Sequence, residues 1–304
     1  MREYLWGMII GTFAVTTVLN TAMASENTAK QPWDQWGVSN PSWVEDMTPY
    51  KMIGNIHYVG TKGIASFLIT SDKGHVLIDG GLPQNAQLIA DNIKALGFDL
   101  RDVKILLNSH AHFDHSGGLA ALKTKSGARL IASEGDRSAL EGGFYLGAED
   151  ILRYTAPPVS VDQIIGDGET VQLGNITLTA SITPGHTRGC TSWGMRVTEQ
   201  NVSYDALFFC SATVAGNRLN PPQYEGIVED YRKTFQKTRD WRPDVFFSNH
   251  PSFFDMDAKR TAQLNGNTLA FIDRKGFPEM MQGLEKAFEA SLETAMQTQP
   301  EPQP

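Results

Sequence analysis

Three histidines and an aspartate lie within six consecutive residues of this 304-residue chain: His110, His112, Asp114 and His115. Imidazole nitrogens and carboxylate oxygens are preferred zinc ligands, and a zinc site that keeps one position open needs three protein ligands. So dense a group of ligand-type residues is typical of a metal site and unusual in ordinary structure. We therefore expect a metal centre here.

The flanking residues indicate where this cluster lies in the fold. The short apolar run Val103–Leu107 precedes it and is typical of a buried strand, and a helical pattern over Gly118–Lys125 follows it. Gly117 and Gly118 allow the backbone to turn between the two elements without a clash at Cβ. The cluster is therefore expected beyond the carboxyl end of a strand, where folds of strands and helices place reactive groups.

Two open zinc sites need six ligands, and the cluster supplies four. Pro184-Gly185-His186-Thr187 follows a predicted strand, and so does Asn249-His250-Pro251. A lone histidine is more often structural, and we interpret His57 and His75 in this way. Together with the cluster, however, His186 and His250 complete a ligand set. The expected ligands are His110, His112 and His186 for one ion and Asp114, His115 and His250 for the other.

Strand and helix patterns alternate through both halves of the chain. Strands are expected over Asn55–Val59, Ala65–Thr70, His75–Ile78, Val103–Leu107, Ala128–Ala132, Thr170–Leu173, Ile176–Ile182, Thr191–Val197, Ala206–Cys210 and Val245–Phe247, and helices from Pro83, over Gly118–Lys125, from Ser133, over Tyr224–Trp241 and over Gly276–Thr294. Two mixed sheets packed face to face, with helices on both outer surfaces, would cover every apolar face of this α/β chain. Without a linker or composition break, residues 25–296 are expected to form one domain and residues 297–304 a disordered tail.

Two segments are rich in aromatic residues. The polar stretch from about residue 25 to 45 carries three tryptophans and two prolines, and suggests an extended arm held by aromatic anchors. The loop Gly142–Pro158 is interpreted either as an apolar wall over a ligand or as an ordinary packed loop.

The first 24 residues predict export. Arg2 precedes the uncharged, largely apolar run Tyr4–Leu19, and Ala22-Met23-Ala24 has the small-x-small pattern that signal peptidase recognises. The run is shorter than the roughly 20 residues that span a bilayer. We expect a signal peptide cleaved after Ala24 and a periplasmic protein, with an uncleaved anchor as the alternative.

Charge and cysteine content narrow the possible partners. The formal net charge of −8, without runs of Lys or Arg, excludes a phosphate-backbone binder and predicts no stable membrane association after signal cleavage. Cys190 and Cys210 are the two cysteines of the chain. Export favours a disulfide between them, and two buried free thiols are the alternative.

His110-x-His112-x-Asp114-His115 resembles the signature of the metallo-β-lactamase superfamily, an αββα sandwich whose members mostly hydrolyse esters, thioesters, lactams or phosphodiesters. The resemblance spans about Met52 to Phe288. Ile78-Asp79-Gly80-Gly81 is similar to an early strand end of the superfamily, which implies that Asp79 supports the metal histidines from behind. The segment around His186 resembles the third motif of the superfamily.

Within the superfamily the chain looks most like subclass B3, in the opening hairpin, in the His186 and His250 segments and in Cys210-Ser211-Ala212-Thr213-Val214-Ala215-Gly216-Asn217. Other subclasses place a cysteine ligand where Ser211 aligns, so the resemblance leaves His115 as the ligand. It also implies that Ser211 and Thr213 receive a substrate carboxylate and that Asn217 polarises a carbonyl. A Cys190–Cys210 pair would tie neighbouring strands under the site.

The resemblance implies a monomeric, small-molecule hydrolase with two Zn²⁺ ions. A zinc-activated hydroxide, oriented by Asp114, would attack the carbonyl of a β-lactam. The alternatives are a lactonase or glyoxalase II-like thioesterase and a non-catalytic metal-binding relative. Lactonases and thioesterases of this kind carry a metal-bridging aspartate on the strand where this chain has Phe209-Cys210-Ser211, which disfavours them. The complete ligand set disfavours a non-catalytic relative. A flavoprotein of this fold would need further domains.

Overall fold

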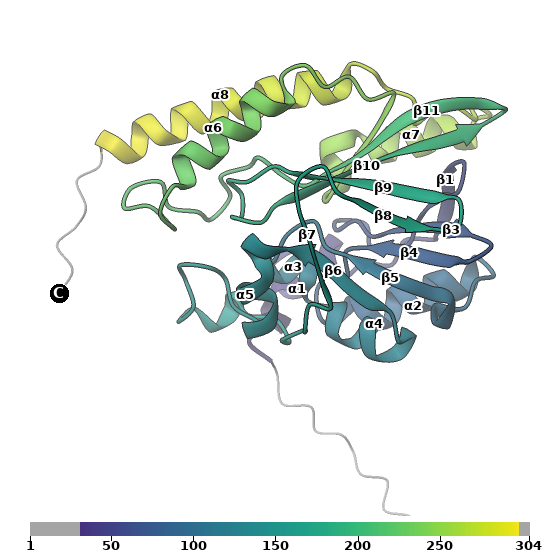
Figure 1. Ribbon diagram of the computed structural model, residues 1–304, viewed down its shortest axis with the longest axis horizontal. Helices are drawn as coiled ribbons and strands as arrows, with labels where there is room; N and C mark the ends of the chain where they lie inside the picture. Colours follow the sequence, from purple (N-terminus) through teal and green to yellow (C-terminus); the bar gives the residue numbers. More distant parts are fainter. Residues whose placement is uncertain (1–30, 298–304) are drawn as a thin grey trace, which may run out of the picture. The chain divides into compact units, whose positions relative to one another are not determined.

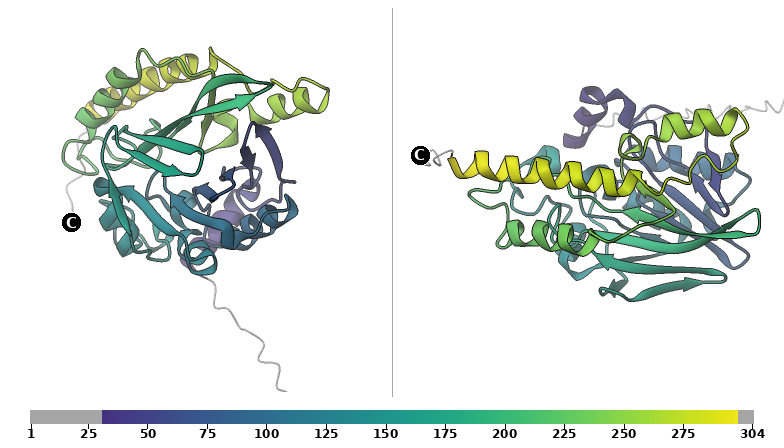
Figure 2. Two further views of the ribbon diagram at one scale, coloured as in Figure 1. Left: turned by 45° about the vertical axis from the view of Figure 1, so that its right-hand side comes forward. Right: turned by 90° about the horizontal axis from the view of Figure 1, so that it is seen from above.

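The computed structural model describes residues 31–297, which form two β-sheets packed face to face with helices on the outer surfaces (Figures 1 and 2). This is the predicted αββα sandwich. The predicted signal peptide, and the predicted tail after Gln297, lie outside the described residues. Between residues 31 and 297, no helix is both long and apolar enough to cross a membrane.

The first sheet has seven strands in chain order. They are β1 (Tyr50–Ile53), β2 (Ile56–Tyr58), β3 (Phe67–Ser71), β4 (Gly74–Ile78), β5 (Val103–Leu107), β6 (Arg129–Ser133) and β7 (Gln163–Ile165). Strands β1 to β4 pair antiparallel, with tight turns between β1 and β2 and between β3 and β4 and a longer loop between β2 and β3, whereas β4 to β7 pair parallel and are connected by helices. The carboxyl ends of β4, β5 and β6 therefore lie at one edge of the sheet, which is where the ligand cluster follows β5.

The second sheet has the strand order β12-β11-β10-β9-β8. Its strands are β8 (Thr170–Leu173), β9 (Ile176–Ile182), β10 (Thr191–Glu199), β11 (Val202–Phe209) and β12 (Val245–Ser248). Only β11 and β12 pair parallel; the other neighbours are antiparallel.

Alternating side chains explain why the two sheets stack. Phe67 of β3 meets Phe208 of β11 and Phe247 of β12 between the sheets, at ring-centroid distances of 5.1 and 5.3 Å. The adjacent residues Phe209 and Phe246 point to the outer face, because successive strand side chains alternate. There they meet Phe277 of the C-terminal helix at 5.2 and 5.9 Å.

Helices cover the outer faces. Helices α2 (Asn85–Ala95), α4 (Leu119–Ser126) and α5 (Glu134–Gly142) share an apolar cluster with the outward leucines of the first sheet. Helices α6 (Ile227–Thr238) and α8 (Gly276–Gln297) lie on the second sheet, and α7 (Met256–Leu264) follows β12 (Figure 1). Burying the apolar stripe of each helix on a sheet removes the remaining apolar surface from water.

The N-terminal segment differs from the predicted extended arm. It forms short helical turns: a 3-10 turn at Pro32–Asp34, helix α1 (Gln35–Ser39) and a second 3-10 turn at Pro41–Trp43. A proline starts each 3-10 turn, where its fixed φ and missing N–H suit the first position of a helical turn. For the part of this segment from residue 31 on, the aromatic anchoring was predicted correctly and the extended conformation was wrong.

Candidate metal centre

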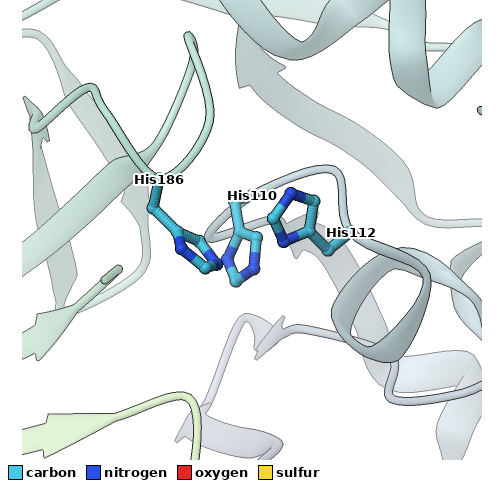
Figure 3. Close-up of side chains that lie close together, drawn as sticks. All are labelled: His110, His112 and His186. Atoms are coloured by element: carbon cyan, nitrogen blue, oxygen red, sulfur yellow. The ribbon is translucent and has the colours of Figure 1, made fainter. Parts of the chain in front are cut away.

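His110, His112 and His186 converge at one end of the sandwich (Figure 3). His110 and His112 lie between β5 and the short helix α3 (Phe113–Ser116), and His186 lies in the loop after β9. One ring nitrogen from each lies within 4.8 Å of those from the other two. Three imidazoles at this separation can share one ion.

A second group of ligand-type atoms adjoins the first. The Oδ2 atom of Asp114, in the first turn of α3, lies 3.1 Å from Nε2 of His115 and 3.4 Å from Nε2 of His250. His250 lies two residues beyond the end of β12, after Asn249. The rings of His110 and His115 are 4.4 Å apart, centroid to centroid, which makes the two groups contiguous. The structure thus brings all six predicted ligands together, from three separate segments.

Hydrogen bonds that they donate to backbone carbonyls orient the two distant histidines. Nδ1 of His186 lies 2.7 Å from the carbonyl oxygen of Thr213, and Nδ1 of His250 lies 2.8 Å from that of Gly63. A carbonyl only accepts, so each Nδ1 carries the proton and each Nε2 keeps its lone pair for an ion. This arrangement is typical of metal-bound histidines.

Asp79 lies behind the cluster, as predicted. It follows β4 with a φ of 62°, in the left-handed region that non-glycine residues rarely adopt. Its carboxylate accepts hydrogen bonds from the backbone N–H of Ser109 at 2.7 Å, the Ser109 hydroxyl at 2.6 Å and the Asn108 amide at 3.0 Å. The Ser109 hydroxyl in turn lies 3.0 Å from Nδ1 of His110. Asp79 thereby orients His110 through Ser109.

Burial fixes the protonation states of the first three histidines. It lowers the pKa of His110 and His112 well below the ordinary histidine value and that of His186 to about 4, so all three are neutral at pH 7. Nε2 of His110 is buried and has no hydrogen-bond partner within residues 31–297. A buried, unpaired lone pair facing other neutral imidazoles fits a bound cation.

Asp114 and His115 lie in contact and shift each other's pKa. Burial alone would raise the pKa of Asp114, but the adjacent His115 and His250 hold it well below its usual range. Burial also opposes the charge on His115, but Asp114 and Asp79 raise its pKa above the ordinary value. A proton on His115 must therefore leave when a metal binds, as is usual for metal sites. Neutral imidazoles with one carboxylate are a donor set that suits zinc.

A cavity of about 400 Å³ opens onto these ligands. Its wall is aromatic: Trp36 stacks on Phe113 and Tyr154 at centroid distances of 4.8 and 5.7 Å, and Tyr145 stacks on the His112 ring at 4.1 Å. Of the three aromatic residues in the Gly142–Pro158 loop, Tyr145 and Tyr154 line this cavity, as the wall interpretation expects, whereas Phe144 packs against the apolar cluster of α2, α4 and α5.

Residues 59–250, more than half of the chain, match the family model described as the metallo-beta-lactamase superfamily. The chain belongs to this superfamily. Among solved structures, BJP-1, a subclass B3 metallo-beta-lactamase of Bradyrhizobium japonicum, is 43% identical with a TM-score of 0.82, over 84% of this chain and 97% of that one. The class B3 di-zinc metallo-beta-lactamase LRA-12 from an Alaskan soil metagenome is 34% identical with a TM-score of 0.78, over 84% and 97%.

Curated relatives of the superfamily have other substrates in their names. The N-acyl homoserine lactonase AttM of Agrobacterium fabrum is 29% identical over 171 residues, which cover 43% of this chain and 59% of the relative. Hydroxyacylglutathione hydrolases match over shorter shares of their length. The chain thus matches between 41% and 59% of the length of these relatives. The relatives and the solved structures thus agree on a metallo-hydrolase and differ in the substrates that their names give.

Two of the three predicted substrate residues line the cavity of this superfamily member. Ser211 and Thr213 lie just after β11, with their hydroxyl oxygens 3.1 Å apart. Asn217 does not line it, contrary to the role that the resemblance implied. Its Oδ1 accepts a hydrogen bond from the Tyr145 hydroxyl at 2.8 Å, and its Nδ2 donates to the His186 carbonyl at 2.9 Å and to Tyr231 at 3.1 Å. The whole amide is thus engaged within the protein, where Asn217 braces the loops instead of facing the cavity.

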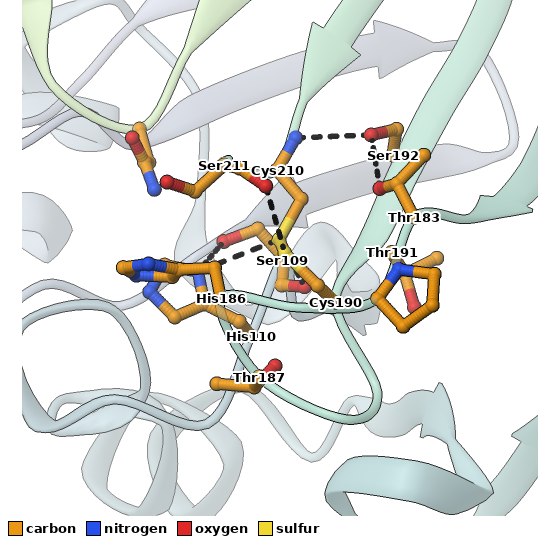
Figure 4. The surroundings of a disulfide bond; sticks show 12 residues. Ser109, His110, Thr183, His186, Thr187, Cys190, Thr191, Ser192, Cys210 and Ser211 are labelled. Carbon is orange, nitrogen blue, oxygen red and sulfur yellow. Dashed lines mark hydrogen bonds between the residues drawn. A yellow bond between two sulfur atoms is a disulfide. The ribbon is translucent and has the colours of Figure 1, made fainter. Parts of the chain in front are cut away.

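The two cysteines form a disulfide beneath the site (Figure 4). Cys190 directly precedes β10 and Cys210 directly follows β11, so the bond ties the His186 loop to the end of the neighbouring strand. Sγ of Cys210 lies 3.1 Å from the Ser109 carbonyl oxygen and 3.7 Å from Nδ1 of His110. The alternative of two free thiols is wrong.

One residue at this site has no counterpart in the sequence predictions. Asp136, in the first turn of α5, is buried and accepts hydrogen bonds beside both His112 and His186. Burial raises its pKa to about 6. Acidic residues are common in the first turn of a helix, so its position in the sequence offers no signal of this role.

Proposed function

We propose that this protein is a zinc-dependent β-lactam hydrolase. The observation that carries the proposal is the second ligand group, in which His115 and His250 flank Asp114 while Ser211 follows β11 in the place of a cysteine ligand. Subclass B3 structures matched over 97% of their length support the proposal. His110, His112 and His186 would hold one Zn²⁺ ion, and Asp114, His115 and His250 a second.

When bound, zinc ions supply Lewis acidity and lower the pKa of a coordinated water toward neutrality. The protein supplies position. In this proposal the Asp114 carboxylate accepts a hydrogen bond from the attacking water and orients it, and the hydroxyls of Ser211 and Thr213 donate to the carboxylate of the β-lactam. The aromatic wall excludes bulk water, which strengthens these polar contacts.

A lactonase or thioesterase is the second candidate, because AttM and the hydroxyacylglutathione hydrolases are relatives. The end of β11 argues against it. Phe209, Cys210 and Ser211 offer no carboxylate that could bridge two ions, and Cys210 is held in the disulfide. Asp205, the acidic residue within β11, is exposed and forms an ion pair with Arg196.

We further propose that the protein acts in the periplasm as a monomer, after cleavage of a signal peptide near Ala24. The Cys190–Cys210 disulfide supports an oxidising compartment, because such bonds are rare in the reducing cytosol. The net charge of −8 is compatible with a small-molecule hydrolase that does not bind nucleic acid.

The decisive experiment measures zinc content and substrate turnover together. Purified protein should contain close to two zinc ions per chain and hydrolyse nitrocefin and a carbapenem, and EDTA should abolish both. N-acyl homoserine lactone and a glutathione thioester are assayed in parallel. Turnover of these two without lactam turnover would assign the second candidate. Full lactam turnover after metal removal would refute zinc chemistry.

A further inference from the structure

Asp136 connects the two loops that carry the first-ion ligands. Its Oδ2 accepts the backbone N–H of Ala111 at 2.9 Å and the Thr187 hydroxyl at 2.9 Å, and its Oδ1 accepts the backbone N–H of Gly189 at 2.9 Å. Ala111 lies between His110 and His112, and Thr187 follows His186. One side chain therefore bonds to neighbours of all three histidines.

Burial of the Asp136 carboxylate is energetically unfavourable. Asp136 is 3% exposed. Within residues 31–297, three hydrogen-bond donors stabilise its negative charge, and no cationic side chain contributes. A buried carboxylate without a counter-ion opposes folding. Hydrogen bonds to a charged acceptor are about twice as strong as neutral ones, which explains how three donors can hold it there.

The backbones around Asp136 leave no room for movement. A Cβ built on Gly189 would lie 2.3 Å from the Asp136 nitrogen, and one on Gly135 would lie 2.8 Å from the Arg188 carbonyl. The Ser133 hydroxyl also donates to the Gly189 carbonyl at 2.5 Å. The first turn of α5 and the turn after His186 thus pack backbone against backbone, and Asp136 reaches across this contact to Ala111.

We propose that Asp136 is a positioning residue for the first metal ion, holding the His110–His112 loop and the His186 loop at the separation that three imidazoles need to share it. This inference rests on the proposed metal centre. Partners that orient metal ligands typically change metal affinity by about 10- to 100-fold when they are removed. Asp136 does so for three ligands at once, through their backbone neighbours.

The test titrates zinc into metal-free protein against a chromophoric chelator. The graded variants are Asp136→Ala, which leaves all three donors unpaired, Asp136→Asn, which can keep the two bonds made by Oδ2, and Thr187→Val, which removes one. Asp162→Asn is the matched control, because Asp162 accepts the Leu130 N–H at 2.7 Å near the other end of β6, away from the ligands.

The expected result is a loss of affinity for one of two zinc ions, about 10- to 100-fold in Asp136→Ala and smaller in Asp136→Asn and Thr187→Val. Saturating zinc should restore turnover in the variants. Asp162→Asn should bind both ions as the parent does, even if its urea midpoint falls. Unchanged zinc affinity in Asp136→Ala, with a lowered urea midpoint, would overturn the inference and reduce Asp136 to a structural role. A parent that binds no zinc would instead overturn the proposed function and this inference with it.

Discussion

Nδ1 of His250 donates a hydrogen bond to the carbonyl oxygen of Gly63, 2.8 Å away and 187 residues earlier in the chain. The N–H of the same glycine donates to the carbonyl oxygen of Ser42 at 2.7 Å. The Trp43 ring lies 5.6 Å from the His250 ring, centroid to centroid. A single residue therefore links the N-terminal segment to a ligand of the second proposed ion.

We predict that Gly63→Ala weakens binding of one zinc ion and destabilises the fold. A Cβ at this position would lie 2.6 Å from the Ser42 hydroxyl and 2.7 Å from Trp43, so the segment or the carbonyl must move. Such overpacking costs about 1–3 kcal/mol of unfolding free energy, measured by urea denaturation. Gly283→Ala is the control, because a Cβ there meets open space on α8. Equal zinc affinity in the parent and Gly63→Ala would contradict the link.

Replacing His112 or His186 by Ala should remove one zinc ion and nearly all turnover. The loss should exceed about 100-fold, the upper range for residues that only orient a ligand. Circular dichroism should show the parent secondary structure, because the sheets are held by the apolar core away from these side chains. A variant that retains turnover would show that the ligand assignment is wrong.

The metal-free protein should lose stability in acid partly through His186. Burial lowers the folded-state pKa of His186 to about 4, against about 6.5 in an unfolded chain, so the unfolded state binds the extra proton between these pH values. The contribution of His186 to the unfolding free energy is therefore fully present above pH 6.5. It is lost as the pH falls to 4, and the loss is on the order of 3 kcal/mol.

The contribution is isolated by comparison with His186→Asn, which does not titrate. Asp136, with its pKa raised to about 6, acts in the opposite direction, because the folded state takes up its proton first. Both proteins contain Asp136, so its effect cancels in the comparison. The loss of unfolding free energy from pH 7 to pH 4 in the parent, minus the same loss in the variant, therefore reports His186. A parent that loses no more stability than the variant over this range would contradict the assigned cause.

Removing the disulfide should destabilise the fold. Cys190 and Cys210 are separated by 20 residues, and cross-linking a loop of this size stabilises a protein by about 3 kcal/mol, chiefly through the unfolded state. The Cys190→Ser, Cys210→Ser double variant and dithiothreitol-treated parent should unfold at the same lowered urea concentration. An unchanged midpoint in both would indicate that the bond contributes nothing to stability.

The ligand set could be predicted because it is dense and its positions follow strand ends. His110, His112, Asp114 and His115 lie in one run, and His186 and His250 each follow an apolar run that the periodicity identifies as a strand. Strands β1 and β7 and helix α7 were missed. The two strands have four and three residues, too few to show a period, and α7 is largely exposed.

Other features depend on contacts that a single sequence does not display. The resemblance implied that Asn217 polarises a substrate carbonyl, yet Tyr145, Tyr231 and the His186 carbonyl engage its amide. The helical turns before residue 45 are stabilised by stacking of Trp36 on Phe113, far along the chain. Local propensity is a weak guide where such distant packing decides the conformation.

The ligands are spread from residue 110 to residue 250, with His250 following the last strand of the second sheet. During synthesis the chain therefore carries five of its six ligands well before the sixth emerges. A nascent or truncated chain that ends before β12 lacks a ligand for the second ion. Occupancy of both proposed positions would thus require a chain that extends at least to residue 250 and two sheets that have already come together.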